Sequence, residues 1–298
     1  MLEKYRYHVW LHLIILMWGF TGILGKLIQL DAIIIVWYRV LIASGFLALY
    51  FLWKGKSFSI PRKHLWKVLV VGMIVAGHWM SFYYSIQLST ASLGILCLST
   101  TTLHVTWLEP IVMKRKFSWV EFLFGICVIF GIYFVASDFN DHEKTALYYG
   151  LFSALLAAFF SVFNGRIARD VESAHITLYE LLTGVLFISV VLWTSGKLTI
   201  PMLKMSLSDG LWLLFLGVIC TSFAFLMTIE IVKKLGAFTV SLSINLEPVY
   251  TIILAIFILK EHTLLNMNFY IGSIVIILVV IANGIYKQQQ LKRNQEII

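Results

Sequence analysis

The sequence predicts an all-α integral membrane protein of ten transmembrane helices, arranged as two inverted five-helix repeats around a central cavity. The chain of 298 residues is 60% hydrophobic and 13% charged, whereas soluble domains carry roughly 25% charged residues. Apolar runs of about 20 residues follow one another, and each matches a helix that crosses about 30 Å of hydrocarbon. Weak sequence similarity between the two halves of the chain indicates the internal repeat. This composition excludes a soluble domain, because too few polar residues remain to cover its surface.

The apolar runs are continuous, which favours helices over the alternating strands of a transmembrane barrel. The first run is too long for a signal peptide and no small-residue cleavage site follows it, so we expect a retained helix. In chain order the predicted spans are 8–27, 32–53, 66–86, 91–112, 118–136, 146–167, 175–195, 210–232, 237–259 and 265–285.

The basic residues indicate which loops face the cytoplasm. An inside N-terminus followed by ten spans places most of the 23 Lys and Arg residues in cytoplasmic segments or adjoining span ends, as the positive-inside rule requires. Both termini are then cytoplasmic. The net charge of +8 is explained by this topology and by attraction to anionic lipid, so we expect the bilayer and no nucleic acid as a partner. The outer side keeps only Lys26, Lys144, Lys197, Lys204 and Lys260.

Short stretches recur between the two halves of the chain. "FTGILGKLI" (20–28) resembles "FSVFNGRIA" (160–168), and "LVVGMI" (69–74) resembles "LFLGVI" (214–219). The order of these stretches is the same in both halves, which indicates an internal repeat.

The gaps between spans support the same division. The longest ones, 54–65 and 196–209, each follow the second span of a half. We predict a first repeat over residues 1–140 and a second, with a cytoplasmic tail, over 141–298. Because each half has an odd number of spans, the second enters the membrane in the opposite orientation. Inverted repeats are typical of secondary transporters, which bind substrate near the midplane; duplication without a transport role is the alternative.

Three stretches carry a family resemblance. They are "LMWGFTG" (16–22), "WYR" (37–39) and "INLEPVYTIILAIFILKE" (244–261). Together with the order of the spans, they resemble the EamA-type transporters of the drug/metabolite transporter superfamily over nearly the whole chain. The resemblance implies a ten-helix bundle with a central cavity. It also implies export of amino acids, metabolites or drugs across a bacterial inner membrane, and it leaves the substrate open.

Glu247 is a candidate substrate or proton site. It lies near the middle of the ninth run, where an ionisable group costs about 2.5–3.5 kcal/mol, and Ser243 and Tyr250 share its helix face. Pro248 lacks an N–H group, so the carbonyl of Ile244 loses its helical partner and the helix can kink. We therefore predict a site for a substrate amine or a proton, with a hinge at Ile244 and Pro248. The alternative is a structural glutamate that is hydrogen-bonded to a neighbouring span.

The tripeptide Leu-Glu-Pro also occurs at Glu109, but the two copies are not equivalent. The register of the repeats aligns Glu247 with residues 100–102. Glu109 lies just before the basic run 114–116, near the cytoplasmic face, so we expect it to pair with that run. The fourth span has no proline corresponding to Pro248, so the sequence does not predict a symmetric pair of kinked helices.

Arg39 is the only basic residue well inside a predicted span. It would pair with Glu247, bind a substrate carboxylate or extend toward the outer face. With Glu247 it could flank a zwitterion, which fits an amino acid. The other candidates are aromatic or hydrogen-bonding residues of the predicted cavity, for which packing inside the bundle is the alternative: Trp18, His78, Trp79, Tyr83 and His104.

Several other chemistries are not expected. Cys97, Cys127 and Cys220 fall inside spans without close metal-ligand spacing, so we predict reduced thiols packed as small apolar groups. His104 and Glu109 lie about 140° apart on a helix, and a metal site needs three or four convergent ligands. We therefore expect no metal and no cofactor.

The function predicted from the sequence is secondary export of amino acids or other small metabolites by alternating access. No GxxxxGK[ST] nucleotide motif is present, so the energy comes from a gradient or from the substrate itself. Protons coupled through Glu247 and passive facilitation are both compatible with the sequence. Efflux of drugs or amphipathic cations is the alternative. An intramembrane enzyme is disfavoured because no nucleophile and base recur at one depth. No obligatory protein partner is evident.

Overall fold

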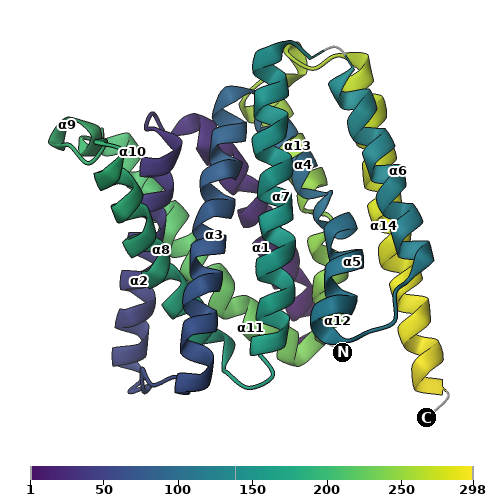
Figure 1. Ribbon diagram of the computed structural model, residues 1–298, viewed down its shortest axis with the longest axis horizontal. Helices are drawn as coiled ribbons and strands as arrows, with labels where there is room; N and C mark the ends of the chain where they lie inside the picture. The colour runs from purple at the N-terminus through teal and green to yellow at the C-terminus, as the bar shows by residue number, and fades with distance from the viewer. Residues whose placement is uncertain (1, 138, 297–298) are drawn as a thin grey trace.

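The computed structural model describes residues 2–137 and 139–296, and these residues form helices without strands (Figure 1). Nine helical stretches of this described chain are long and apolar enough to cross a membrane, and each coincides with a predicted span. The elements are α1 (Leu2–Leu27), α2 (Ala32–Trp53), α3 (Arg62–Leu88), α4 (Ala91–Leu98), α5 (Thr101–Met113), α6 (Trp119–Ala136), α7 (Asp141–Ile167), α8 (Ser173–Thr194), α9 (Ile200–Leu203), α10 (Leu207–Leu214), the π-helix η1 (Phe215–Phe223), α11 (Ala224–Leu235), α12 (Ala237–Ile244), α13 (Glu247–Ile258), the 3-10 turn η2 (Glu261–Thr263) and α14 (Met267–Glu296).

The helices form one bundle with two ends. Helix α1 begins and α14 ends at the bottom of Figure 1, which we call the lower end, and the turn between α6 and α7 lies at the opposite, upper end. The loops after α2, α5 and α7 also lie at the lower end. The long helices run between these two ends, so their residue order gives the depth of each side chain.

The fourth stretch consists of α4 and α5, so the prediction of one continuous helix here is wrong. The hydroxyls of Thr100 and Thr102 donate to the carbonyls of Cys97 at 2.7 Å and Ser99 at 2.9 Å. The N–H groups of Ser99 and Thr100 bind carbonyls three residues back, at Leu96 and Cys97. Side-chain hydroxyls compete with the helical backbone in this way. A run of serine and threonine therefore interrupts this helix without a proline.

The predicted ninth span, 237–259, is also interrupted. Helix α12 ends at Ile244 and α13 begins at Glu247, with Pro248 in its first turn. The kink expected at this proline is therefore present as a break between two short helices. The break residues Ser99 and Asn245 differ by 146 in residue number. This difference is close to the 145 that separates the recurring stretches 69–74 and 214–219.

Small residues let several helices touch along their backbones. Helices α6 and α14 lie side by side at one edge of the bundle (Figure 1). A Cβ atom on Gly272 would lie 2.5 Å from the carbonyl oxygen of Gly131. Helices α1 and α13 make a similar contact, because a Cβ on Gly19 would lie 2.9 Å from Thr251 Oγ1. Helices in membranes associate through such close van der Waals contact.

We predict that Gly272→Ala destabilises the protein by about 1–3 kcal/mol, because the added methyl group forces α6 and α14 apart. Gly45→Ala is the control, since a Cβ there meets nothing within 4 Å, and alanine favours a helix by up to ~1 kcal/mol relative to glycine. Thermal unfolding of the purified protein in detergent measures both. Equal stability of the two variants would contradict this packing.

Candidate functional site

The candidate site is built around the buried side chain of Arg39 on α2, which is 4% exposed. Its Nε donates a hydrogen bond to Thr221 Oγ1 at 3.0 Å. Its Nη1 makes a longer contact of 3.5 Å with the hydroxyl oxygen of Tyr83. The guanidinium carbon lies 4.1 Å from the ring centroid of Trp79. Three elements, α3, η1 and α2, therefore converge on one positive charge, and the predicted residues Arg39, Trp79 and Tyr83 are brought together.

These contacts replace the water that the guanidinium loses. An arginine at the centre of a membrane helix costs about 2.5–3.5 kcal/mol on insertion scales, and it stays protonated. A hydrogen bond to a charged group contributes about 1.5–3 kcal/mol, and a desolvated cation–π contact contributes about 2 kcal/mol. Described residues occupy two of the five N–H groups of Arg39. The remaining N–H groups have no partner in this part of the chain and can bind a ligand.

Thr221 owes its position to the π-helix η1. Its hydroxyl donates to the carbonyl of Leu216, five residues back, at 2.8 Å. The hydroxyl oxygen keeps a lone pair that accepts from Arg39. Short π-helical segments are frequent at functional sites. Thr221 was not predicted from the sequence as a site residue. The polar pair Thr221 and Ser222 inside an apolar span could have indicated it.

Tyr83 links the site to α1. Its side chain is fully buried, and its hydroxyl donates to the carbonyl oxygen of Thr21 at 3.2 Å. The phenol oxygen of Tyr83 also accepts the N–H of Arg39, so the hydroxyl donates to a backbone carbonyl while it solvates the cation. This arrangement holds the phenol and the guanidinium in fixed positions.

Glu247 begins α13 at the interruption of the ninth span. It lies near enough to Arg39 for the two charges to interact, but the two side chains do not form an ion pair within 4.0 Å in the described structure. The direct pair that the sequence left open is therefore not formed. The Glu247 side chain is partly buried, and its backbone carbonyl accepts from the hydroxyl of Thr251 at 2.9 Å. A cation and a carboxyl group are thus both available near the helix break.

His78 lies between α3 and α7. Its Nδ1 is 2.9 Å from the carbonyl oxygen and 2.8 Å from Oγ of Ser153. The ring stacks on Phe82 with a centroid distance of 6.3 Å, and the residue is 5% exposed. Its contacts in this structure join two helices, and its role in substrate binding stays a prediction.

Trp18 and Tyr250 contact other residues of the same region. The Trp18 ring lies 5.9 Å from that of Phe225 on α11. The hydroxyl of Tyr250 lies 3.0 Å from Nδ1 of His12 on α1. These contacts hold α1 against α11 and α13, below Arg39 along the bundle.

Ser243 and His104 lie close to the interruptions of the ninth and fourth spans, on α12 and α5. The hydroxyl of Ser243 donates to the carbonyl of Thr239 within α12, at 2.9 Å. His104 is half-buried on α5, which packs against α6 and α7. Neither side chain contacts Arg39 in the described structure, so their place in a substrate site stays a prediction.

Glu180 on α8 is another buried ionisable residue, for which no role was predicted from the sequence. It is 7% exposed, and its Oε1 has no hydrogen-bond partner among the described residues. Asn164 interacts with the carboxyl group. Gly72 on α3 packs against the backbone of Glu180, where a Cβ would lie 2.9 Å from its carbonyl oxygen. Arg39 and Glu180 differ by 141 in residue number, close to the 140 between the recurring stretches 20–28 and 160–168.

Comparison with known proteins decides the family. The family model of the EamA-like transporters matches residues 6–137 and 144–284. The chain belongs to the EamA-like transporter family. It is a multi-pass membrane transporter, and the resemblance identified in the sequence is confirmed.

Two further proteins are similar to this EamA-like transporter. The uncharacterized transporter YoaV of Bacillus subtilis (strain 168) is 21% identical over 271 residues, which cover 88% of this chain and 90% of YoaV. A solved structure titled "Crystal structure of protein" superposes with a TM-score of 0.66 at 16% identity, and covers 94% of this chain and 97% of its own. The first is a transporter by its name, and the second shares the fold.

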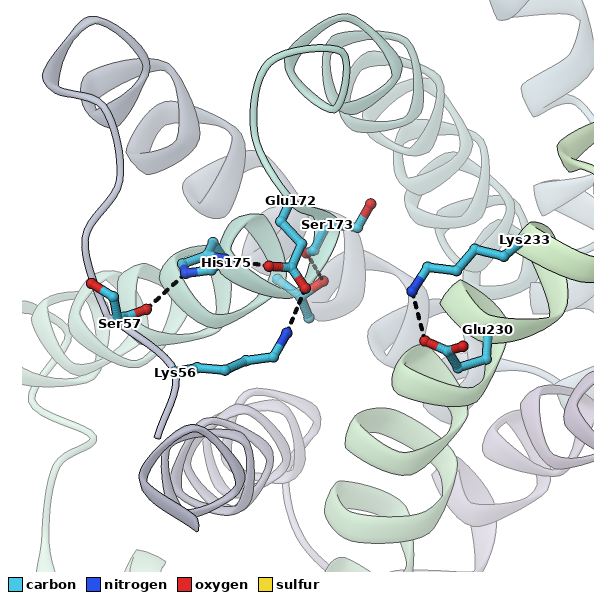
Figure 2. A network of polar contacts seen from close by, with 8 residues as sticks. Lys56, Ser57, Glu172, Ser173, His175, Glu230 and Lys233 are labelled. Atoms are coloured by element: carbon cyan, nitrogen blue, oxygen red, sulfur yellow. Dashed lines mark hydrogen bonds and ion pairs between the residues drawn. The ribbon is translucent and has the colours of Figure 1, made fainter. Parts of the chain in front are cut away.

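At the lower end of the EamA-like transporter, the loop after α2 is fastened to the start of α8 (Figure 2). The ammonium group of Lys56 lies 2.5 Å from Glu172. His175 Nε2 lies 2.8 Å from the carbonyl oxygen of Ser57, and its Nδ1 lies 3.4 Å from Glu172. The hydrogen bond from Lys56 lowers the pKa of the Glu172 carboxyl below its ordinary value. These contacts join a loop of the first half to a helix of the second.

A matching attachment lies at the upper end. Lys197, after α8, lies 3.6 Å from Asp31 before α2. Lys56 and Lys197 differ by 141 in residue number, as do Asp31 and Glu172. The hydroxyl of Tyr38 donates to Leu203 O at 3.0 Å at the upper end, and that of Tyr179 donates to Phe58 O at 2.9 Å at the lower end. Each half therefore attaches its longest loop to the other half.

Two ion pairs lie at helix ends, and the first confirms the pairing predicted for Glu109. Glu109 pairs with Arg115 at 2.7 Å, and Glu230 pairs with Lys233 at 2.7 Å, beside the Lys56–Glu172 pair in Figure 2. Of the cysteines, Cys97 and Cys220 are free and buried, as predicted, but Cys127 is free and exposed on α6. The prediction of a packed thiol is wrong there, because Cys127 lies on the same exposed face of α6 as Leu123 and Phe130.

We predict that the Lys56–Glu172 pair stabilises the protein by about 0.2–1 kcal/mol, the range for exposed pairs. Because the folded pKa of Glu172 lies below the unfolded one, this contribution is present above the ordinary pKa of 4.5. It is lost as the pH falls through the lower, folded value. Thermal unfolding between pH 7 and pH 4 should therefore show Glu172→Gln less stable than wild type at pH 7, with a gap that narrows on acidification.

Lys56→Gln supplies the control for this prediction. In that background, Glu172→Gln should lower the stability at pH 7 by less than it does in the wild type, because the pair is already broken and only the contact with His175 remains. A gap that persists undiminished in the Lys56→Gln background would show that Glu172 acts through other contacts.

Proposed function

We propose that this EamA-like transporter is a secondary transporter that exports amino acids or other small metabolites across the bacterial inner membrane by alternating access. The observation that carries the proposal is the buried guanidinium of Arg39, which keeps N–H groups without a partner among the described residues and whose charge interacts with the carboxyl group of Glu247 without an ion pair. A carboxylate can accept from the guanidinium, and an ammonium can donate to the carboxyl group. Together these two groups suit a zwitterion.

The proposal includes a bundle of ten crossings formed by two inverted repeats. The helix contacts support it, because they recur with the halves exchanged. Helix α1 packs on α13, and α7 packs on α4 and α5; likewise α3 packs on α8, and α2 packs on η1. The helices α6 and α14, and also α2 and α8, pair with each other. An inverted two-fold relation between the halves requires this exchange. The two segments matched by the family model support the same division into two halves.

The glycine contacts support the relation at the level of single residues. Gly72 meets Glu180, and Gly217 meets Arg39, whose carbonyl oxygen would lie 3.3 Å from an added Cβ. Gly72 and Gly217 differ by 145 in residue number, and Arg39 and Glu180 differ by 141. Each half therefore places a glycine of its third span against the charged residue in the second span of the other half.

An inverted repeat supplies the exchange that alternating access needs. When the two halves adopt different conformations, exchange of those conformations closes one end of the bundle and opens the other. The interruptions at Ser99 and Asn245 place irregular backbone inside the bundle in both halves. Such backbone is tolerated at membrane depth where it is buried in protein or lines a cavity. We propose that the breaks act as hinges, with Ile244 and Pro248 at the second.

The alternative substrate class, amphipathic cations, is less well supported. Arg39 puts a permanent positive charge into the site, and its guanidinium already covers the face of Trp79. An aromatic face is the group that a cationic substrate would need. Proton coupling through Glu247 and passive facilitation both fit this site. The basic loops at the lower end favour the cytoplasm as the side that this end faces.

We predict that the protein in proteoliposomes exchanges at least one amino acid across the membrane by counterflow. Glu247→Gln should then weaken that exchange about 10- to 100-fold, because a charge-assisted hydrogen bond is worth about 1.5–3 kcal/mol. Arg39→Gln should do the same. The matched control is Glu230→Gln, which removes an exposed carboxyl group at the lower end.

Three results would contradict the proposal: unsaturable flux, product formation in place of exchange, or unchanged transport by a well-folded Glu247→Gln variant. The first two would remove the carrier mechanism. The third would leave the carrier and remove Glu247 from its substrate site.

A further inference from the structure

A groove lies at the lower end of the bundle, between α3, α5 and α7. Its volume is ≈ 360 Å³, which is about tenfold the ~30 Å³ that one water molecule occupies in the liquid. Val70 and Ile74 of α3, Val112 of α5 and Phe163 of α7 form its apolar walls. Trp66 stands at the rim and is 62% exposed. The groove therefore offers an accessible apolar surface at this end of the bundle.

The charged residues of this groove gather at one end. Lys67 lies in the second turn of α3, and Arg166 lies in the last turn of α7. Val70 and Ile74 follow Lys67 by about one and two helical turns, toward the membrane interior. Phe163 precedes Arg166 by about one turn on the same face. The groove is thus basic at the membrane surface and apolar deeper, which is the polarity of a lipid molecule.

The two cations are available to a ligand. Both side chains are exposed, and neither forms an ion pair or a hydrogen bond with another described residue. The carboxyl group of Asp170, which also lines the groove, lies 3.2 Å from Nε2 of His64. His64 is 6% exposed, and its ring nitrogens have no hydrogen-bond partner in the described structure. With two cations and one carboxyl group, the mouth of the groove therefore carries a net positive charge.

We propose that this groove binds one anionic phospholipid of the leaflet at the lower end of the bundle. Lys67 and Arg166 hold its phosphate, and an acyl chain lies against Val70, Ile74 and Val112. Basic pockets between transmembrane helices bind acidic lipid headgroups in this way. A small soluble anion would leave the apolar walls uncovered, and a zwitterionic lipid would bring no net charge to the two cations. The proposal does not depend on what the protein transports.

The test uses native mass spectrometry of the detergent-purified, full-length protein with added phosphatidylglycerol or phosphatidylcholine. The wild type should retain one phosphatidylglycerol in preference to phosphatidylcholine, and inorganic phosphate should not displace it. The double variant Lys67→Gln/Arg166→Gln should bind this lipid roughly 10- to 30-fold more weakly, since each cation near a membrane surface is worth about 1 kcal/mol. Both side chains are exposed, so the variant is expected to fold.

The matched control is Lys54→Gln/Arg169→Gln, which removes the same charge at the same end from residues outside the groove. It should bind phosphatidylglycerol as the wild type does. An equal loss in the control would show diffuse attraction to basic residues, and equal retention of both lipids would show an apolar groove without headgroup recognition. Displacement by inorganic phosphate would show a site for a soluble anion. Each of these results overturns the proposal and leaves the transport assays of the proposed function unaffected.

Discussion

A permanently charged guanidinium inside a membrane has to be solvated by the protein, and the centre of this structure depends on that constraint. Arg39 is 4% exposed, and two neighbouring elements supply its partners. The π-helix turns the hydroxyl of Thr221 toward it, and α3 supplies Trp79 and Tyr83. Gly217 lets η1 approach the backbone of α2. Removing any one partner leaves part of a buried charge unsolvated, which is costly.

The fourth and ninth spans are both interrupted by a helix break, but different residue types cause the two breaks. In the ninth span, Pro248 removes a backbone donor, and in the fourth a run of serine and threonine hydroxyls binds carbonyls that the helix would use. The breaks at Ser99 and Asn245 nevertheless fall at matching positions. We infer that the packing of each half, rather than one residue type, holds the break in place. This agrees with the other paired contacts, from the glycines to the ion pairs at the two ends.

Much of the fold follows from the sequence, because span length and apolar runs are local properties. The spans and the break beside Pro248 could be predicted. Arg39, Trp79 and Tyr83 were each predicted as cavity residues, but their contacts with one another were not. The break at Ser99 was missed, since serine and threonine inside a helix usually bond locally without ending it. Thr221 was missed because its position depends on the π-helix. Glu180 was missed because its significance appears only when its residue number is compared with that of Arg39. The local pattern of apolar residues does not indicate which distant segments contact one another.

The most direct test of the account is whether the centre of the bundle is reached in turn from each side. Asn245 lies at the break and is partly exposed, so Asn245→Cys can be introduced after Cys97, Cys127 and Cys220 are replaced by serine or alanine. A membrane-impermeant thiol reagent is then added to either face of sealed vesicles. Alternating access predicts that the new cysteine reacts from both faces. Reaction from one face only, or from neither, would contradict it.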